Sequence, residues 1–357
     1  MAIVAVADQR SWPAAQLDAV AVLSVTERTP LLAWAARVIT LKPQAREASV
    51  GGQPSVLVRP GGRGPWPAVV FINGATRLGR HHPKVLRLAR GLARVGFLVV
   101  VPDLPGLRLG EITPATADAT ARVALATAAR PDVRGGRVVL DGVSVGASLA
   151  LLAAERPGLA SRVTVVGGEA PWTDMKRIIR LATTGRYKGR PYASDPYAAL
   201  AIARSLAAGL APERGRAKLV RLLEGVSDDD PRPLAGLRAG EYRDGAGALV
   251  KLLLNRDPSR FERLYAALPR RVRESVAALS PLREAARLQA PVELASAPHD
   301  KYFPPAESRA LARVAPHVHL TVTSTLDHAV PRPSLRDLRD LFRIDGFVVR
   351  FLHAARR

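Results

Sequence analysis

The stretch 138-VVLDGVSVGASLALLAA-154 runs from an apolar, β-branched segment through Gly-x-Ser-x-Gly into a helical pattern. Gly142 and Gly146 fit a tight connection between a strand and a helix. Ser144 between them has two interpretations: a nucleophile held on a strained turn, or an ordinary serine in that connection. The five-residue pattern recurs by chance in glycine-rich chains, so the rest of the chain must separate the two.

The composition indicates a folded chain with a sizeable core. Its 357 residues suffice for one large α/β domain with an insertion, or for two modest domains. Hydrophobic residues make up 48% and aromatic residues 5%, so Ala, Leu and Val must supply most of the core. Cysteine is absent, which excludes disulfides, thiolate metal sites and a cysteine nucleophile.

The formal net charge of +22 comes mostly from arginine. Such a charge is typical of proteins that bind nucleic acid or an anionic membrane surface. Here the arginines are spread along the chain, and no block of five or six consecutive like charges occurs. We therefore expect a solvated basic surface and no nucleic-acid partner. Peripheral contact with a membrane is a second alternative, but no sequence feature supports it.

The sequence predicts neither a membrane span nor a secretory signal. The longest uncharged runs, 64–76 and 142–154, reach about 13 residues, short of the ~20 that cross a bilayer. The chain starts without a basic segment ahead of an apolar one and meets Asp8 early, so we predict a cytoplasmic protein. Residues 30–41, PLLAWAARVITL, have helical spacing and predict a strap over the domain. The alternative is a helix on a membrane or in a dimer.

From residue 46 apolar strands alternate with single helices. The predicted strands cover 47–60 as a hairpin turning at Gly51-Gly52, 65–74, 97–106, 136–142, 161–170, 290–300 and 318–328. The predicted helices cover 83–96, 116–130, the segment after Ser144, and 334–357, where Leu335, Leu338, Leu341 and Phe342 form an apolar stripe. This alternation predicts an α/β fold with a mostly parallel central sheet flanked by helices, and with ligands at the carboxyl ends of the strands.

Strand signals stop between residues 171 and 288, where helical periodicity is broken by Asp, Gly and Pro. Because strand signals resume afterwards, we interpret 171–288 as a helical insertion in a core made of 46–170 and 289–357. Residues 1–45 form a helical lead. Such an insertion is expected to lie over the carboxyl edge of the sheet as a lid.

A serine hydroxyl needs a base to accept its proton and a third group to orient that base. Of seven histidines, only His328 lies in a loop after the last strand, in TLDHAVPRP. The others precede the serine, alternate along a strand, lie in the last helix or adjoin the acid candidate. The alternative for His328 is a loop histidine that caps backbone groups.

The acid candidate is Asp300, in PHDKYFPP at the end of a strand. Glu169 and Asp174 follow the preceding strand and are its rivals, and a turn aspartate is the alternative for Asp300 itself. Asp103 precedes the serine and is expected to anchor a turn. Asp327 adjoins His328 in sequence, and adjacent residues seldom point toward each other.

A tetrahedral intermediate also needs backbone donors for its oxyanion. We expect one from Val145 N–H, at the start of the helix after Ser144. The other is expected from Ala75 N–H in FINGATRLG, where Gly74 frees the backbone. A simple turn is the alternative for Asn73-Gly74.

Residues 46–357 resemble the α/β-hydrolase superfamily, in particular its esterase-like and dienelactone-hydrolase-like members with a helical lid. The similarity lies in VLVRPGGRGPWPAVVFINGA, GLARVGFLVVVPDLPG, LSPLREAARLQAPVELASAPHDKYFPPAES and LDHAVP, beside the Ser144 motif. It implies that Ser144 is the nucleophile, His328 the base and Asp300 the acid. It also implies that Ala75 and Val145 donate to the oxyanion.

The chain departs from the family pattern at three places. Ala147-Ser148 follows the second glycine of the Ser144 motif, where the family often has another glycine. Asn73-Gly74 stands where His-Gly is common, and Ala297 stands where a glycine often precedes the acid. The resemblance implies a serine hydrolase that cleaves a carboxylic ester or related small-molecule acyl substrate through an acyl-enzyme, without cofactor or metal. A peptidase, thioesterase or acyltransferase would use the same residues, and a non-catalytic basic binding protein is the alternative from another class.

Overall fold

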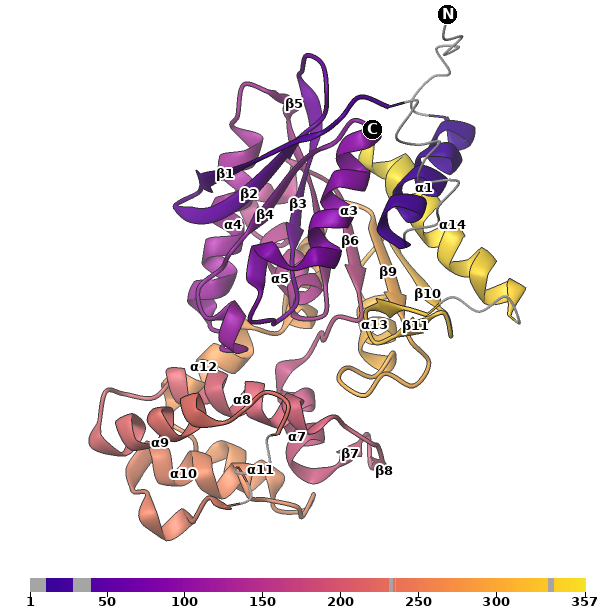
Figure 1. The fold of residues 1–357 in the computed structure, drawn as a ribbon. Helices are drawn as coiled ribbons and strands as arrows, with labels where there is room; N and C mark the ends of the chain where they lie inside the picture. The colour runs from indigo at the N-terminus through magenta and orange to yellow at the C-terminus, as the bar shows by residue number, and fades with distance from the viewer. Residues whose placement is uncertain (1–10, 28–39, 231–233, 235, 333–336) are drawn as a thin grey trace, which may run out of the picture.

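A twisted sheet forms the centre of the computed structural model, which describes residues 11–27, 40–230, 234, 236–332 and 337–357. Within these residues the sheet has eight strands in the order β1-β2-β4-β3-β5-β6-β9-β10 (Figure 1). Their bounds are β1 Gln44–Val50, β2 Gln53–Arg59, β3 Trp66–Ile72, β4 Leu98–Pro102, β5 Val133–Val143, β6 Val163–Glu169, β9 Val292–Ser296 and β10 Val318–Val322. Strand β2 is antiparallel to both its neighbours, and the other neighbours pair in parallel. The predicted fold class is confirmed.

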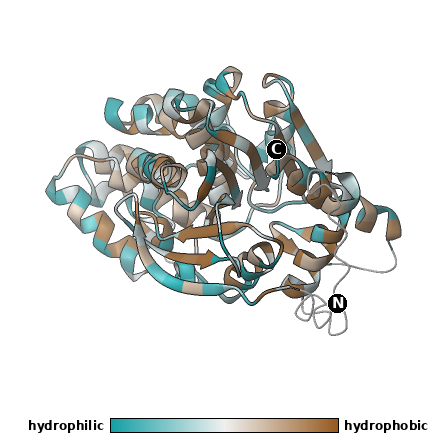
Figure 2. Ribbon diagram, turned by 90° about the horizontal axis from the view of Figure 1, so that it is seen from above, coloured by the Kyte–Doolittle hydropathy of each residue, from teal (hydrophilic) through white to brown (hydrophobic). Residues whose placement is uncertain are grey.

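Helices cover both faces of the sheet, which explains why its inner strands are apolar on both faces. Leu57, Val70 and Leu140 pack with α4 (Pro114–Ala128) and α5 (Val145–Ala154). The alternate positions pack with α1 (Trp12–Glu27), α3 (Pro83–Arg94) and α14 (Leu338–Ala355). Figure 2 shows the apolar strands between these layers.

The predicted turn at Gly51-Gly52 joins β1 and β2. Both glycines have positive φ, 57° and 77°, as the tight turn of a two-residue hairpin requires. Gly51 has a second constraint, because a Cβ there would lie 2.7 Å from the backbone of Arg122 on α4. The hairpin is therefore fixed against the helix layer.

The segment between β6 and β9 is mainly helical and lies at the end of the sheet toward which the parallel strands run (Figure 1). We refer to residues 171–288 as the helical insertion. It holds α7 Met175–Thr184, α8 Pro196–Ala208, α9 Arg214–Gly225, α10 Asp244–Leu253, α11 Phe261–Ala266 and α12 Arg270–Ala278. It also holds a short hairpin, β7 Arg186–Tyr187 with β8 Arg190–Pro191, which the sequence did not predict.

The predicted apolar stripe on the last helix is wrong. Leu338 and Phe342 are 60% and 74% exposed, and α14 instead buries Phe347, Phe351 and Leu352. The first turns of α14 extend beyond the sheet, so only its later residues reach the core (Figure 1). Leu335 lies outside the described residues.

Two other predictions at the ends of the chain need comment. The strand predicted over 318–328 stops at Val322, and Leu326–Asp327 (β11) pairs with Val330–Pro331 (β12) as a small hairpin around His328. Of the helix predicted over 30–41, residues 30–39 lie outside the described residues, and residues 40 and 41 are not helical. In the described part of the chain, no helix is long and apolar enough to cross a membrane.

Glu155, at the carboxyl end of α5, is a buried carboxyl group that forms no ion pair with any described residue, although Arg156 and Arg287 are near enough to lower its pKa slightly. Its side chain is 5% exposed, and Oε1 has no hydrogen-bond partner among the described residues. Burial and the neighbouring Glu284 raise the pKa of Glu155 to about 9. Folding therefore favours the protonated form of this group.

We predict that Glu155→Gln stabilises the protein at alkaline pH. A carboxyl whose pKa is raised on folding stabilises fully below its unfolded pKa, and that contribution is lost as pH rises toward 9. Each pKa unit between the folded and unfolded states corresponds to about 1.4 kcal/mol. The free energy of unfolding of the variant should therefore exceed that of the wild type by a few kcal/mol at pH 8 and equal it at pH 4. Urea unfolding at both pH values measures this, with Glu213→Gln, at an exposed glutamate that does not act on Glu155, as the control. An unchanged pH dependence in Glu155→Gln would contradict it.

Candidate active site

Ser144 sits on a strained turn between β5 and α5. Its backbone has φ 57° and ψ −122°, a region that residues with a side chain rarely adopt. Its N–H donates to the Glu169 carbonyl at 2.7 Å, which ties the turn to the end of β6. A conformation of this kind persists only where the surrounding structure holds it, and such positions cluster at functional sites.

The two glycines beside Ser144 are required by close backbone contacts. A Cβ on Gly146 would lie 2.0 Å from the Ile72 carbonyl oxygen at the end of β3. A Cβ on Gly142 would lie 2.5 Å from the Gly146 carbonyl carbon. The turn therefore explains both glycines, and the positive φ of Ser144 directs its side chain away from the sheet.

The structure brings Ser144, His328 and Asp300 together from three separate parts of the chain. His328 Nε2 lies 2.8 Å from Ser144 Oγ, and His328 Nδ1 lies 2.7 Å from Asp300 Oδ2. His328 occupies the turn of the β11–β12 hairpin with φ 55°, and its side chain is 17% exposed. The three side chains form one continuous line of hydrogen bonds.

Asp300 is fully buried and its carboxylate is held by backbone groups. Oδ1 accepts hydrogen bonds from the N–H groups of Tyr302 and Phe303 at 2.8 and 2.9 Å. Ala297, which replaces a common glycine before the acid, has no positive φ and accommodates its side chain in the core. An ionised carboxylate only accepts, so His328 Nδ1 carries the proton and Nε2 of the neutral ring accepts from Ser144.

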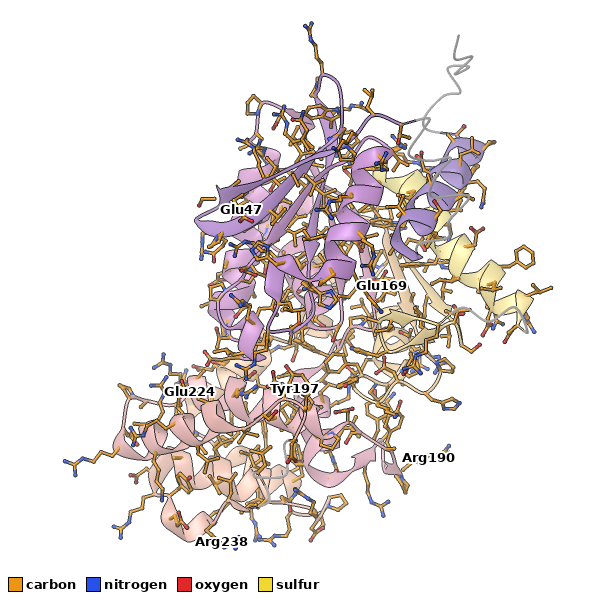
Figure 3. The ribbon with its side chains drawn as sticks, viewed as in Figure 1. Glu47, Glu169, Arg190, Tyr197, Glu224 and Arg238 are labelled. Carbon is orange, nitrogen blue, oxygen red and sulfur yellow. The ribbon has the colours of Figure 1, made fainter. Side chains whose placement is uncertain are left out.

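The rival acid Glu169 does not contact His328. It lies at the end of β6 on the same face as Asp141 of β5, since Asp141 pairs with Gly167 and Glu169 with Val143. Glu169 is half-buried and lines the cavity together with Asp141; Figure 3 labels it at the end of β6. Burial raises the pKa of Asp141 to about 7, and burial together with Asp141 raises the pKa of Glu169 well above its usual value.

The other carboxylates considered from the sequence have local partners. Asp174 caps α7 by accepting from Arg177 N–H, Asp103 accepts from the N–H of Arg80, and Asp327 pairs with Arg332 at 2.7 Å. These contacts leave Asp300 as the carboxylate on His328.

The loop after β3 packs directly against Ser144. A Cβ on Gly74 would lie 3.5 Å from Ser144 Cβ, so Ala75 follows at the edge of the site. Val145 N–H, in the first turn of α5, has no partner within the helix. These are the two positions expected to supply oxyanion donors.

The side chain that holds this loop, Asn73, was not predicted from the sequence as a site residue. Asn73 is 5% exposed; its Nδ2 donates to the Gly79 carbonyl at 2.9 Å, and its Oδ1 accepts from Gly74 N–H at 2.8 Å. One buried amide thus pins both ends of the loop. The position of Asn73 directly before a glycine was the only sequence signal of that role.

A cavity of about 860 Å³ reaches Ser144 and His328, a size usual for small-molecule sites. The core and the helical insertion share its mainly apolar lining. The apolar part of the lining includes Ile112, Trp172, Met175, Ile178 and Phe303. Tyr197 of α8 also lines it, where the insertion meets the core (Figure 3). None of these residues was assigned to the site from the sequence.

The order of these parts along the chain decides the fold family. The serine stands on a sharp strand-to-helix turn, and its acid and histidine partners follow on later loops, in that order. The chain has the α/β-hydrolase fold. The helical insertion lies between the sixth strand of this α/β-hydrolase core and the strand that carries Asp300.

Comparison with known proteins gives distant structural similarities. No protein-family model matches the sequence, and no curated protein matches it. A 2,6-dihydroxy-pseudo-oxynicotine hydrolase is 16% identical over 92% of this chain and 73% of its own, with a TM-score of 0.48. A meta-cleavage product hydrolase from Pseudomonas fluorescens is 14% identical over 86% and 96%, with a TM-score of 0.46.

An acylaminoacyl peptidase from Pyrococcus horikoshii is similar over 87% of this chain, at 14% identity and a TM-score of 0.49. The chain spans 42% of the length of that peptidase. At these identities the assignment of the fold rests on the chain's own strand order and Ser144 turn.

We predict that Asp300, and not Glu169, holds the proton on His328 Nδ1. A histidine N–H bonded to a carboxylate gives a far-downfield proton NMR signal. Asp300→Asn should remove or strongly shift this signal, because the charged acceptor is lost, whereas Glu169→Gln should leave it in place. Loss of the signal in Glu169→Gln alone would contradict the pairing.

Proposed function

We propose that this protein is a serine hydrolase that cleaves a carboxylic ester or related acyl substrate through an acyl-enzyme. The observation that carries the proposal is the hydrogen-bonded line from Asp300 through His328 to Ser144 at the cavity. A base within 2.8 Å of a serine hydroxyl, oriented by a buried carboxylate, is the arrangement that activates serine for attack.

In the first half of the reaction, Ser144 Oγ attacks the acyl carbon while His328 Nε2 takes its proton. The negative charge on the former carbonyl oxygen is stabilised by the N–H groups of Ala75 and Val145. As the tetrahedral intermediate collapses, His328 gives the proton to the leaving oxygen. Asp300 keeps its charge throughout and stabilises the imidazolium.

In the second half, water replaces the leaving group. His328 takes a proton from the water as its oxygen attacks the acyl carbon of the ester on Ser144. The same N–H groups hold the second tetrahedral intermediate, and His328 returns the proton to Ser144 Oγ as the acid leaves. The protein ends in its starting protonation state.

The cavity lining favours an apolar acyl group. Trp172 and Phe303 pack edge to face at 5.3 Å beside the site, and Tyr302 lies 4.5 Å from the His328 ring. The helical insertion adds Met175, which is buried. In this proposal the insertion acts as the lid that shapes the acyl pocket and limits access of water.

We predict that Ser144→Ala lowers the turnover of short p-nitrophenyl esters by roughly 10³-fold or more, since the nucleophile is removed. The same change should abolish labelling by a fluorophosphonate probe. Ser161→Ala, at an exposed serine after the short helix α6 (Pro157–Ala160), is the matched control and should behave like the wild type. Unchanged turnover in Ser144→Ala would overturn the proposed function.

We also predict that kcat/KM for p-nitrophenyl esters rises from acetate to butyrate. Each methylene buried in an apolar pocket contributes about 0.8 kcal/mol, or roughly fourfold. Amides and thioesters of the preferred acyl group, assayed beside the ester, identify the leaving group that the enzyme handles best. A flat or falling series from acetate to butyrate would contradict an apolar acyl pocket.

A further inference from the structure

We propose that the helical insertion positions the reacting groups from two sides. Through Tyr192 it holds the loop of Asp300, and through Asp228 and Arg77 it holds the loop of Ala75. The inference rests on the proposed function. It makes Tyr192, Arg77 and Asp228 positioning residues that act through Asp300 and Ala75.

On the acid side, the insertion binds the backbone of the loop that carries Asp300. The Tyr192 hydroxyl donates to the Asp300 carbonyl oxygen at 2.6 Å, and Asp195 N–H donates to the Lys301 carbonyl oxygen at 2.9 Å. The carboxylate of Asp300 is held from within its own loop by Tyr302 and Phe303 N–H. The insertion therefore helps to fix the backbone from which this loop presents its carboxylate to His328.

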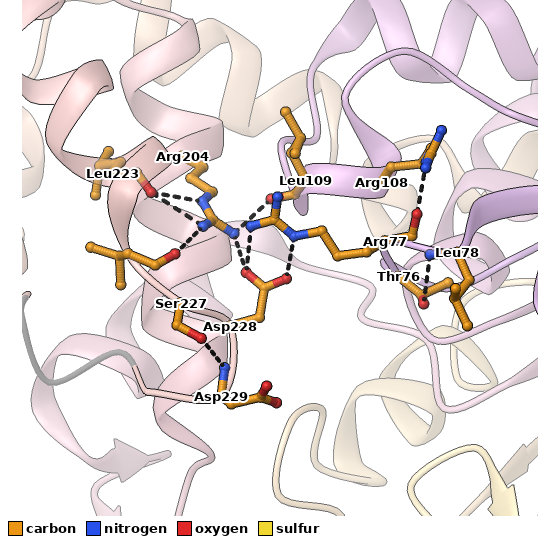
Figure 4. A network of polar contacts seen from close by, with 11 residues as sticks. Thr76, Arg77, Leu78, Arg108, Leu109, Arg204, Leu223, Ser227, Asp228 and Asp229 are labelled. Atoms are coloured by element: carbon orange, nitrogen blue, oxygen red, sulfur yellow. Dashed lines mark hydrogen bonds and ion pairs between the residues drawn. The ribbon is translucent and has the colours of Figure 1, made fainter.

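On the oxyanion side, Arg77 is two residues beyond Ala75 and forms a two-point contact with Asp228 of the insertion (Figure 4). Arg77 Nε lies 2.9 Å from Asp228 Oδ2, and Nη2 lies 3.3 Å from Oδ1. The carbonyl of Arg77 accepts from Arg108 Nε at 2.8 Å. The insertion thus joins Arg108 and Asn73 in holding this loop.

Asp228 can hold Arg77 because Asp228 is itself anchored on a buried arginine. The side chain of Arg204 on α8 is 6% exposed and donates to Asp228 Oδ1 at 2.6 Å (Figure 4). The same guanidinium donates to the carbonyl groups of Leu223, Val226 and Leu109. An isolated exposed ion pair contributes little to stability. Here Arg204 holds one carboxylate oxygen of Asp228 independently of Arg77, so Arg77 binds a carboxylate that is already oriented.

The contacts made by Tyr192 and by Asp228 help to position the Asp300 carboxylate and the Ala75 N–H, whose interactions are strongest in the transition state. Oxyanion donors act at 2.7–3.1 Å from the developing charge, and small displacements are costly. Loss of either contact should therefore lower kcat with little change in KM. A role in stability alone would change the melting temperature and leave kcat of the folded protein unaltered.

The acid-side test compares Tyr192→Phe with Tyr265→Phe in the full chain. Tyr265, also in the insertion, stacks on Phe261 and is distant in sequence from both loops. Removing one hydrogen bond should lower kcat by about tenfold in Tyr192→Phe. The acid limb of kcat/KM should also move to lower pH, because a carboxylate held less closely stabilises the imidazolium less. Tyr265→Phe should match the wild type.

The oxyanion-side test compares Arg77→Gln with Arg221→Gln, an exposed arginine on α9. Arg77→Gln should lower kcat and the rate of fluorophosphonate labelling together, by about threefold to tenfold, with KM and the pH profile unchanged. Arg77→Lys should recover part of the loss. Arg77 is the position to change because Asp228→Asn would also leave buried Arg204 without its carboxylate.

The outcomes separate this inference from the proposed function. Wild-type kcat, labelling and pH profile in Tyr192→Phe and Arg77→Gln, with Ser144→Ala inactive, overturn the positioning role and leave the hydrolase intact. A lower melting temperature with unchanged kcat also overturns it. Activity that survives in Ser144→Ala overturns the hydrolase itself. Losses in both variants that multiply in the double variant support two independent contacts.

Discussion

The close approach of α5 to the end of β3 is the constraint on which the site depends. Gly146 lies against the Ile72 carbonyl with no room for a side chain, so the chain must leave β5 through a turn that only a strained residue can complete. That residue is Ser144. The same turn brings Ser144 Oγ to His328 and puts Val145 at the start of α5, and the loop after β3 packs against Ser144. The packing of one helix on one strand thus places the serine and one expected oxyanion donor.

The core beneath this turn keeps charged groups in an unfavourable environment. Asp141 and Glu169 lie on one face of neighbouring strands and line the same cavity as Ser144, and no ion pair to either occurs in the described part of a chain with a net charge of +22. Burial raises the pKa of each, so the protonated forms are favoured there. Asp300 differs because two backbone N–H groups and His328 satisfy its carboxylate. The hydrogen-bond donors around each carboxyl group therefore decide whether its charged form is stabilised, as in Asp300, or disfavoured, as in Asp141 and Glu169.

The helical insertion connects parts of the core that share no direct contact in the sheet. It contributes apolar side chains to the cavity, a tyrosine hydroxyl to the acid loop and a carboxylate to the oxyanion loop. The sheet fixes only the point at which each loop begins. Contacts from outside the sheet are therefore needed to hold the rest of the loop in place. An inserted segment over the carboxyl edge can provide those contacts on both sides of Ser144.

The sequence by itself determined the alternation of strands and helices, the helical segment between residues 171 and 288, and the selection of Ser144, Asp300 and His328. These follow from local periodicity, turn residues and order along the chain. Tertiary structure alone decided that Glu169 lies away from His328, that Leu338 and Phe342 are exposed, and that Asn73 pins a loop. Those outcomes depend on which face of a strand or helix packs against a segment distant in sequence. Local sequence patterns do not specify such contacts.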